Sequence, residues 1–317
     1  MDLFLNVVVL VIAIIFLARS SVMIVNSLEK IAAYLGLSDF SIAFLLMALA
    51  TSLPEIFVGI SAAIENVPSL VLGNVVGSNI VNLSIVFGIV VIVSGGLHAQ
   101  GVIARRDSLY MMMFSATPIL LLLDNELSRG DGFVLLIFYI IYILRLLGQR
   151  KSFQEASDGV TKREAVRSGI AFGISVLILI ISAEALVRVS MNISQAVGLS
   201  VGLVGLFIVS IGTSLPELAF SIETARKKED SLLLGDLIGS VVTNSTFVLG
   251  ITALVRPIVI PNINIYVIPI AFLLTVLIVF EILVRRNKKL TMIHGIAFIF
   301  IFVIFMVSEL IFGVVSQ

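Results

Sequence analysis

Ten stretches of about 20 mainly apolar residues follow one another along this chain. They lie near residues 3–26, 39–64, 70–95, 108–123, 131–147, 168–190, 200–225, 231–254, 264–284 and 291–313. A helix needs about 20 apolar residues to cross a bilayer, and lipid accepts only backbones that satisfy their own hydrogen bonds. We therefore expect an all-α membrane protein with ten transmembrane helices. The first stretch has no basic segment before it and is interpreted as a retained helix, not a signal peptide.

The amino-acid composition is also that of a membrane protein. Hydrophobic residues make up 59% of the 317 residues and charged residues 13%, whereas a soluble domain averages about 45–50% and about 25%. The 20 Lys and Arg residues balance 20 Asp and Glu residues, so no basic surplus is present to bind nucleic acid. Cysteine is absent, which excludes thiolate metal sites and thiol catalysis. The expected partners are the lipid bilayer and ions, with no nucleic acid and no evident obligate protein partner.

Basic residues are divided unequally between the two ends of these stretches. If the stretches alternate in direction, three loop residues, Arg129, Arg188 and Arg256, share the side of the N-terminus, against sixteen on the other side. Cytoplasmic loops carry the excess of Lys and Arg. We expect a multi-pass protein of the cell membrane with both termini outside and a polar cytoplasmic linker at residues 148–167.

Two segments of the chain match each other at a constant offset of 162 residues. Ala50-Thr51-Ser52-Leu53-Pro54-Glu55 is matched by Gly212-Thr213-Ser214-Leu215-Pro216-Glu217, and residues 72–82 are matched by 234–244. The chain therefore consists of two related halves, 1–147 and 168–317, with five stretches each. Because five is odd, the halves enter the membrane in opposite senses, which is the inverted-repeat plan of many secondary transporters. The best-matched helices are near 39–95 and 200–254.

The repeated motif places a carboxylate beside a helix break in mid-membrane. Glu55 and Glu217 lie in apolar stretches, where acidic residues are costly and usually mark ion or proton paths. Pro54 and Pro216 each remove a backbone donor, so the second and seventh helices should be broken. The freed carbonyls, together with the nearby hydroxyls of the two Thr-Ser pairs (Thr51, Ser52, Thr213 and Ser214), form an all-oxygen environment. Hard cations such as calcium prefer such ligands.

The next helix of each half carries a polar stripe. Asn74, Ser78 and Asn82 are spaced i, i+4, i+8 and share one helix face, as do the equivalent residues Asp236, Ser240 and Asn244. Glycines at 73, 77, 235 and 239 have the small-xxx-small spacing that lets helices approach closely. We expect both stripes to face the broken helices.

These paired motifs resemble those of the cation/calcium antiporter superfamily, and most closely its sodium/calcium exchanger branch. The resemblance covers essentially the whole chain and implies that the second and third helices of each half form the ion site. It implies that calcium is held by Glu55, Glu217 and the carbonyls of Thr51 and Thr213. It further implies that the sodium sites add Ser78, Ser240 and the carbonyls near Ala48 and Ser210, with Asn82 and Asn244 lining the centre.

The chain departs from the family pattern at two places. Family members often carry aspartate at one of the positions of Asn82 and Asn244, where this chain has asparagine in both. Asp236 stands where the first half, like much of the family, has asparagine. The number of carboxylates is kept, but one has moved two turns along its helix, which leaves the counter-ion and the stoichiometry open.

We therefore predict a secondary-active antiporter that exchanges calcium for sodium, with proton-coupled cation exchange as the alternative and a cation channel as a further one. The chain has no His-Glu-x-x-His, Gly-x-Ser-x-Gly or ATP-binding motif. No enzyme activity and no cofactor are predicted, and the energy source should be an ion gradient.

Overall fold

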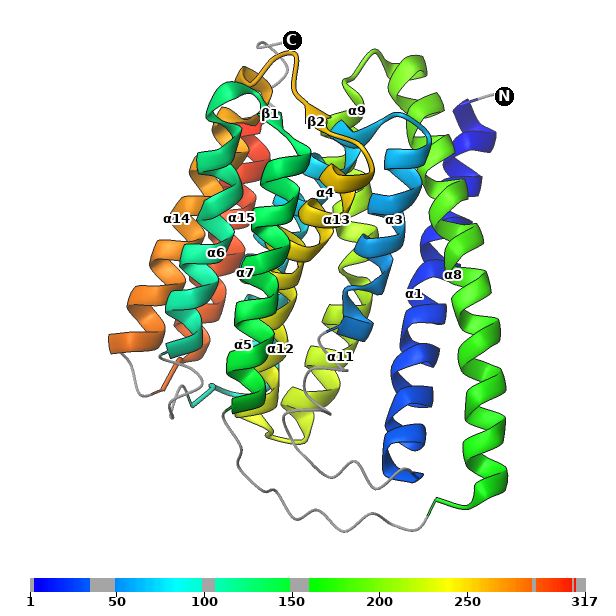
Figure 1. The fold of residues 1–317 in the computed structure, drawn as a ribbon. Coiled ribbons are helices and arrows are strands. Elements are labelled where there is room, and N and C mark those ends of the chain that lie inside the picture. The colour runs from blue at the N-terminus through cyan, green and yellow to red at the C-terminus, as the bar shows by residue number, and fades with distance from the viewer. Residues whose placement is uncertain are drawn as a thin grey trace.

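The computed structural model describes residues 3–34, 49–98, 106–148, 160–286, 289–309 and 311. The fold is that of an all-helical membrane protein (Figure 1). Within the described ranges, 7 helices are long and apolar enough to cross a membrane: Leu3–Tyr34, Pro68–Val93, Arg129–Leu147, Lys162–Val197, Val201–Arg226, Asp230–Val255 and Asn264–Arg286. Shorter apolar helices occupy Leu53–Ile64, Ser108–Asp124 and Met292–Ser308. The ten expected stretches thus all contain helix, but three of these helices are shorter than a full span over the described residues.

Two long helices, α1 (Leu3–Tyr34) and α8 (Lys162–Val197), pack side by side and stand at one flank of the bundle (Figure 1). α8 begins well before the apolar stretch at 168, because Thr161 and Glu164 form a capping box at its N-terminus. It ends at Gly198, which adopts the left-handed conformation with φ 73°. α1 continues without interruption beyond the apolar stretch at 3–26 to Tyr34.

The other described helices form a bundle around a buried centre. Its elements in the first half are α3 (Leu53–Ile64), α4 (Pro68–Val81), η1 (Asn82–Val86), α5 (Phe87–Val93), α6 (Ser108–Leu121), η3 (Leu122–Asp124) and α7 (Arg129–Gly148). Those in the second half are α9 (Val201–Val204), η4 (Gly205–Val209), α10 (Ser210–Thr213), α11 (Leu215–Arg226), α12 (Asp230–Val242), η5 (Thr243–Val248), α13 (Leu249–Val255), α14 (Asn264–Arg286) and α15 (Met292–Ser308). The segments Pro68–Val93 and Asp230–Val255 are the most enclosed, with 83% and 78% of their apolar windows buried, against 33% for α1. The polar stripes therefore lie on the central helices of the fold.

Glycines let the central helices touch backbone to backbone. A Cβ added to Gly77 would lie 2.2 Å from the carbonyl oxygen of Leu206, and one added to Gly205 would lie 2.3 Å from that of Leu70. Gly88 of α5 meets Gly295 of α15 in the same way, and Gly250 of α13 meets Gly132 of α7. Elements from different halves of the chain are thus packed directly against each other at these points.

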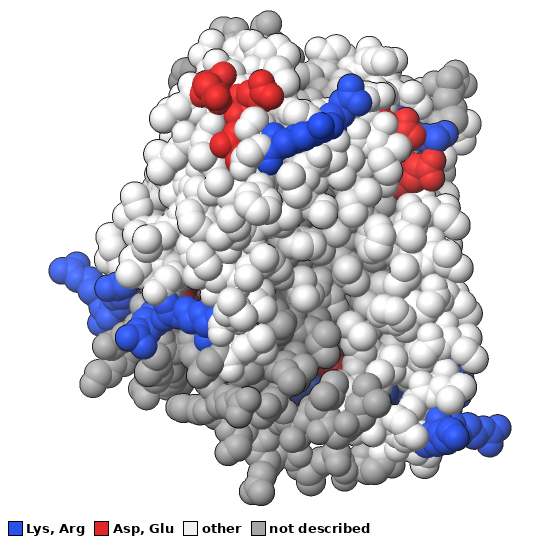
Figure 2. All heavy atoms as spheres, viewed as in Figure 1, with Lys and Arg blue, Asp and Glu red and all other residues white. Residues whose placement is uncertain are grey.

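Short backbone pairings join the halves at the ends of the bundle. Strand β1 (Glu126–Leu127) pairs antiparallel with β2 (Ile258–Val259), and Leu97 forms a bridge with Leu290. α1 begins and α15 ends at the same end of the molecule, whereas α8 begins at the opposite end (Figure 1). On the face shown in Figure 2, coloured charged side chains gather near the two ends and uncharged residues fill a broad band between them. This distribution is that of a protein whose middle faces lipid.

Candidate functional site

The helix breaks expected at the two prolines are single-residue interruptions. Ser52 precedes α3 and Ser214 separates α10 from α11, with nearly identical backbone angles of φ −83°, ψ 3° and φ −82°, ψ 1°. Each of the following helices has Pro in its first turn, where the missing N–H is tolerated. Glu55 and Glu217 are therefore first-turn residues, at the end of the helix where the macrodipole favours an anion.

Both glutamates are completely buried, each with 0% of its surface exposed. The hydroxyl of Ser78 donates to one Glu55 oxygen at 3.4 Å, and the second oxygen has no hydrogen-bond partner among the described residues. Both oxygens of Glu217 are likewise without a partner there, although Glu217 lies within electrostatic range of Glu55 and of Asp236. Carboxylates from the two halves thus converge in the centre of the bundle.

The two motif threonines reach into the opposite half of the chain. The Thr51 hydroxyl donates to Asp236 at 3.2 Å and lies 3.3 Å from the Ser240 hydroxyl. The Thr213 hydroxyl donates to the Asn74 amide oxygen at 3.1 Å and lies 3.2 Å from the Ser78 hydroxyl. Every residue in the first set corresponds to one in the second at the offset of 162. Two residues of each polar stripe thus face the interrupted helix of the other half: Asn74 and Ser78 face Thr213, and Asp236 and Ser240 face Thr51.

The central asparagines lie at the start of irregular helical turns that the sequence did not predict. Asn82 begins the π-helical segment η1, and Asn244 lies in the π-helical segment η5. Neither polar atom of the Asn82 side chain is hydrogen-bonded within the described residues. The Asn244 amide donates to Asn79 at 3.4 Å, and Asn79 donates to Ser245 at 2.8 Å. π-helical turns are rare and often occur at functional sites.

Asn79 and Ser245 are two central polar residues that the motif analysis did not select. Both are buried, and they join the halves by a direct hydrogen bond. Their equivalents in the repeat, Val241 and Leu83, are apolar. A search restricted to matching residues therefore misses them, whereas a search for every amide in an apolar helix would have found Asn79.

The remaining predicted ligands surround the same centre where the structure describes them. The Ser210 carbonyl accepts from the Ser214 amide at 3.0 Å, and the hydroxyls of Thr213 and Ser78 point to it at 3.3 and 3.4 Å. The hydroxyls of Ser52 and Ser214 are buried without hydrogen-bond partners among the described residues. Ala48 lies outside the described residues.

The centre is rich in unpaired oxygen atoms. Asp236 Oδ2 and Asn244 Oδ1 join the glutamate and serine oxygens as buried acceptors without hydrogen-bond partners in the described ranges. Such atoms are rare in proteins because each forfeits its hydration without compensation. Among the described residues, no three His, Cys, Asp or Glu side chains are grouped as a metal centre. A cation here would draw on hydroxyl, amide and carbonyl oxygens as well as carboxylates, as hard cations do.

Comparison with known proteins identifies relatives over nearly the whole chain. The family model described as "sodium/calcium exchanger protein" matches residues 5–148 and 168–310. The inner membrane protein YrbG of Escherichia coli is 30% identical over 233 residues, which are 70% of this chain and 71% of that protein. The sodium/calcium exchanger MaX1 of Methanosarcina acetivorans is 27% identical over 303 residues, covering 82% and 86%.

The fold is similar to a solved structure as well. The sodium-calcium exchanger NCX_Mj, in crystals soaked with Na⁺ and Sr²⁺, superposes with a TM-score of 0.69 at 26% identity. The match covers 97% of this chain and 99% of that one. The likeness includes the central helices and both halves of the chain.

Proposed function

The chain belongs to the sodium/calcium exchanger protein family, and from this premise we propose that it exchanges calcium for sodium across a membrane by alternating access. The family is one of transporters, and the chain is a multi-pass membrane protein of the cation/calcium exchanger type. The ion pair and the mechanism are our proposal. The observation that carries it is that Glu55 and Glu217, both fully buried, lie within electrostatic range of each other, among oxygen atoms that have no hydrogen-bond partner in the described residues.

We propose that the two halves are inverted repeats of five transmembrane helices each. Three pairs of contacts support this arrangement. The Thr51 contacts repeat as the Thr213 contacts, the Gly88–Gly295 approach repeats as Gly250–Gly132, and the bridge at Leu97 resembles the β1–β2 pairing. In each pair, the first contact joins one part of the first half to another part of the second half, and the second contact joins the same two parts with the halves exchanged. A pseudo-two-fold axis in the membrane plane would require this.

Calcium is held by Glu55 and Glu217 in this proposal, with the carbonyls of Thr51 and Thr213 completing its shell. Two carboxylates match the double charge of the ion, and calcium accepts six to eight oxygen ligands in flexible geometry. Sodium ions occupy overlapping sites that use the surrounding hydroxyls, amides and carbonyls: Ser52, Ser214, Ser78, Ser240, Asn82, Asn244, Asn74, Asp236, Ser210 and Ala48.

Exchange follows from this shared use of ligands. Calcium and sodium cannot fill overlapping sites together, so each must leave before the other binds. An empty site would carry uncompensated carboxylates through the membrane, which is strongly unfavourable. Only the loaded forms can reorient, and transport of one ion is therefore coupled to that of the other.

Uptake of calcium-45 into proteoliposomes tests this function. We expect calcium to accumulate inside above its outside concentration when sodium is trapped inside and diluted outside, and no such accumulation when sodium is equal on both sides. An imposed pH gradient without sodium is the matched comparison. Uptake driven equally well by a gradient of protons alone would reject sodium as the coupling ion.

Asp236 supports proton-coupled exchange as the second candidate. It is a third buried carboxylate, within electrostatic range of Glu217, so calcium held by the two glutamates leaves one negative charge to be balanced. A bound proton would balance it as well as a sodium ion. The pH-gradient arm of the same uptake experiment separates the two functions.

A further inference from the structure

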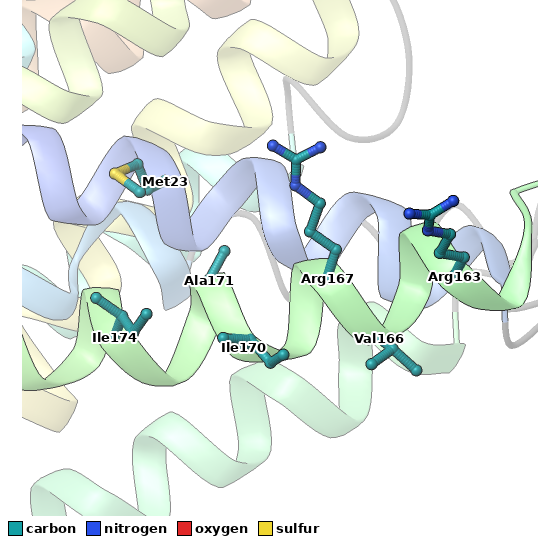
Figure 3. A pocket seen from close by; sticks show the side chains of 7 residues that line it. All are labelled: Met23, Arg163, Val166, Arg167, Ile170, Ala171 and Ile174. Carbon is teal, nitrogen blue, oxygen red and sulfur yellow. The ribbon is translucent and has the colours of Figure 1, made fainter.

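A groove lies between α1 and α8, away from the ion site. It is lined by Met23 of α1 and by Arg163, Val166, Arg167, Ile170, Ala171 and Ile174 of α8, and has a volume of about 450 Å³ (Figure 3). The α8 residues recur every three or four positions and so share one face of the helix. The groove lies toward the N-terminal end of α8, where an apolar helix surface passes into a basic one.

The floor of this groove is apolar and uncovered. Met23, Val166, Ile170 and Ile174 expose 44%, 56%, 61% and 51% of their surfaces. In a membrane protein, apolar side chains that expose this much of their surface are expected to contact lipid chains. The volume is within the range of sites that hold small molecules, and it would accept the first part of an acyl chain together with a headgroup.

Two guanidinium groups, those of Arg163 and Arg167, lie at the edge of the groove. Arg163 and Arg167 extend from the same side of α8 (Figure 3), and both side chains are exposed. In the described part of the chain neither forms an ion pair with a carboxylate. Glu164, the nearest acid in the sequence, is engaged in capping the helix through Thr161. Within the described residues, the positive charge of the groove is therefore not neutralised by an ion pair.

Packing of the helix pair does not require these arginines. At the repeat offset, the position in α1 equivalent to Arg167 is Leu5, which is itself 47% exposed. The position that the repeat places opposite Arg167 is thus apolar and not basic. Arginine binds phosphate oxygens in a planar, bidentate manner, and basic residues next to apolar helix surfaces attract anionic lipids.

We propose that the groove binds an anionic phospholipid of the membrane leaflet that surrounds the N-terminal end of α8. The two guanidinium groups hold the phosphate, and an acyl chain lies along Val166, Ile170, Ile174 and Met23. The inference is independent of which ions the protein transports.

Native mass spectrometry of the purified protein in detergent tests this site. Dioleoyl phosphatidylglycerol and dioleoyl phosphatidylcholine carry the same chains and differ in charge, and we expect the former to bind more tightly. The double variant Arg163→Gln/Arg167→Gln should lose roughly 25-fold in affinity for phosphatidylglycerol, at about fivefold per arginine. The matched control Arg226→Gln/Arg286→Gln removes two exposed basic residues from the same side and should change affinity by less than about twofold.

Two further arms identify the ligand and the groove. An excess of inorganic phosphate should not displace the lipid, because the apolar floor contributes to binding. Ala171→Phe, which keeps both arginines but fills the groove, should weaken binding of phosphatidylglycerol. Equal binding of the two lipids, full binding by the arginine or phenylalanine variant, or displacement by phosphate would each overturn the proposal. Elution volume and thermal unfolding of each variant verify that it is folded.

Discussion

Thr51 and Thr213 occupy equivalent positions in the two halves, yet their hydroxyls bond to different groups. Thr51 donates to the carboxylate of Asp236, whereas Thr213 donates to the amide of Asn74. The site is therefore symmetric in geometry but not in charge. Exchanging Asn74 and Asp236 would move one negative charge from one half to the other with little change in shape.

The Asp236→Asn variant should change the coupling but not abolish calcium binding. Its amide oxygen can still accept from Thr51, while one negative charge is lost from the site. We expect the charge moved per calcium to change by one elementary charge, because one sodium ion or proton fewer is needed. The reversal potential of exchange in proteoliposomes under fixed gradients measures this number. An unchanged reversal potential would exclude Asp236 from the coupling site.

The Thr213→Val variant should destabilise the protein. It removes the donor to Asn74 and leaves buried polar atoms of Asn74 and Ser78 without that contact, at a cost of about 1–3 kcal/mol. Thr275→Val is the control, because the Thr275 hydroxyl is exposed and bonds only to Ala271 of its own helix. Thermal unfolding in detergent compares the two. Equal midpoints for both variants would show that the Thr213 contacts do not hold the helices together.

At the level of the helices, glycines set how closely the two halves approach. Gly77 and Gly205 allow α4 and η4 to pack backbone against backbone, which places Ser78 and Asn74 within reach of Thr213. The small-xxx-small spacing at Gly73 and Gly77 predicted a close approach. Its partner could not be identified from one half alone, because the contact is made across the repeat.

A methyl group at position 205 should separate these helices. The added Cβ of Gly205→Ala would lie 2.3 Å from the Leu70 carbonyl, and such overpacking typically costs about 1–3 kcal/mol. Gly173→Ala is the matched control in α8, since nothing lies within 4 Å of its Cβ, and it should be neutral or stabilising by up to about 1 kcal/mol. Unfolding midpoints and calcium exchange rates are the readouts. Wild-type stability of the Gly205 variant would contradict the packing.

The secondary structure was predictable where it depends only on residues that are close together in the sequence. Apolar length predicted the helices, and Pro54 and Pro216 predicted interruptions that the structure has at Ser52 and Ser214. The π-helical turns at Asn82 and Asn244 were not predictable, because neighbouring side chains across the bundle decide whether a helix widens. The long α8 shows a related limit: its capping box at Thr161 extends the helix beyond the apolar stretch.

On the scale of the whole molecule, the orientation remains a prediction from the distribution of Lys and Arg. The chain has no cysteine, so single reporter cysteines can be introduced without background. Leu123 lies at the end of the bundle that holds β1, and Ser231 lies at the start of α12; both residues are exposed. Each is replaced by cysteine in a separate variant, Leu123→Cys or Ser231→Cys. A membrane-impermeant maleimide added to intact cells should label Leu123→Cys alone, with Ser231→Cys labelled after permeabilisation. The reverse pattern would invert the proposed topology.

The candidate site was largely predictable because its residues repeat. Matching motifs identified both glutamates, both threonines and the two polar stripes before their positions in space were known. The repeat could not show which residues of one half contact which residues of the other. It also could not identify unmatched residues such as Asn79 and Ser245, which form a hydrogen bond between the halves. The picture that we propose is a single central site to which each half contributes one glutamate.

Equilibrium binding of calcium-45 to the purified protein tests this picture most directly. We predict one calcium ion per chain, with affinity reduced more than about 100-fold in both Glu55→Gln and Glu217→Gln, beyond the 10–100-fold typical of residues outside the ligand shell. The control Glu223→Gln, at an exposed carboxylate paired with Lys227, should bind as the wild type does. Retention of wild-type binding by either central variant would contradict a site shared between the two glutamates.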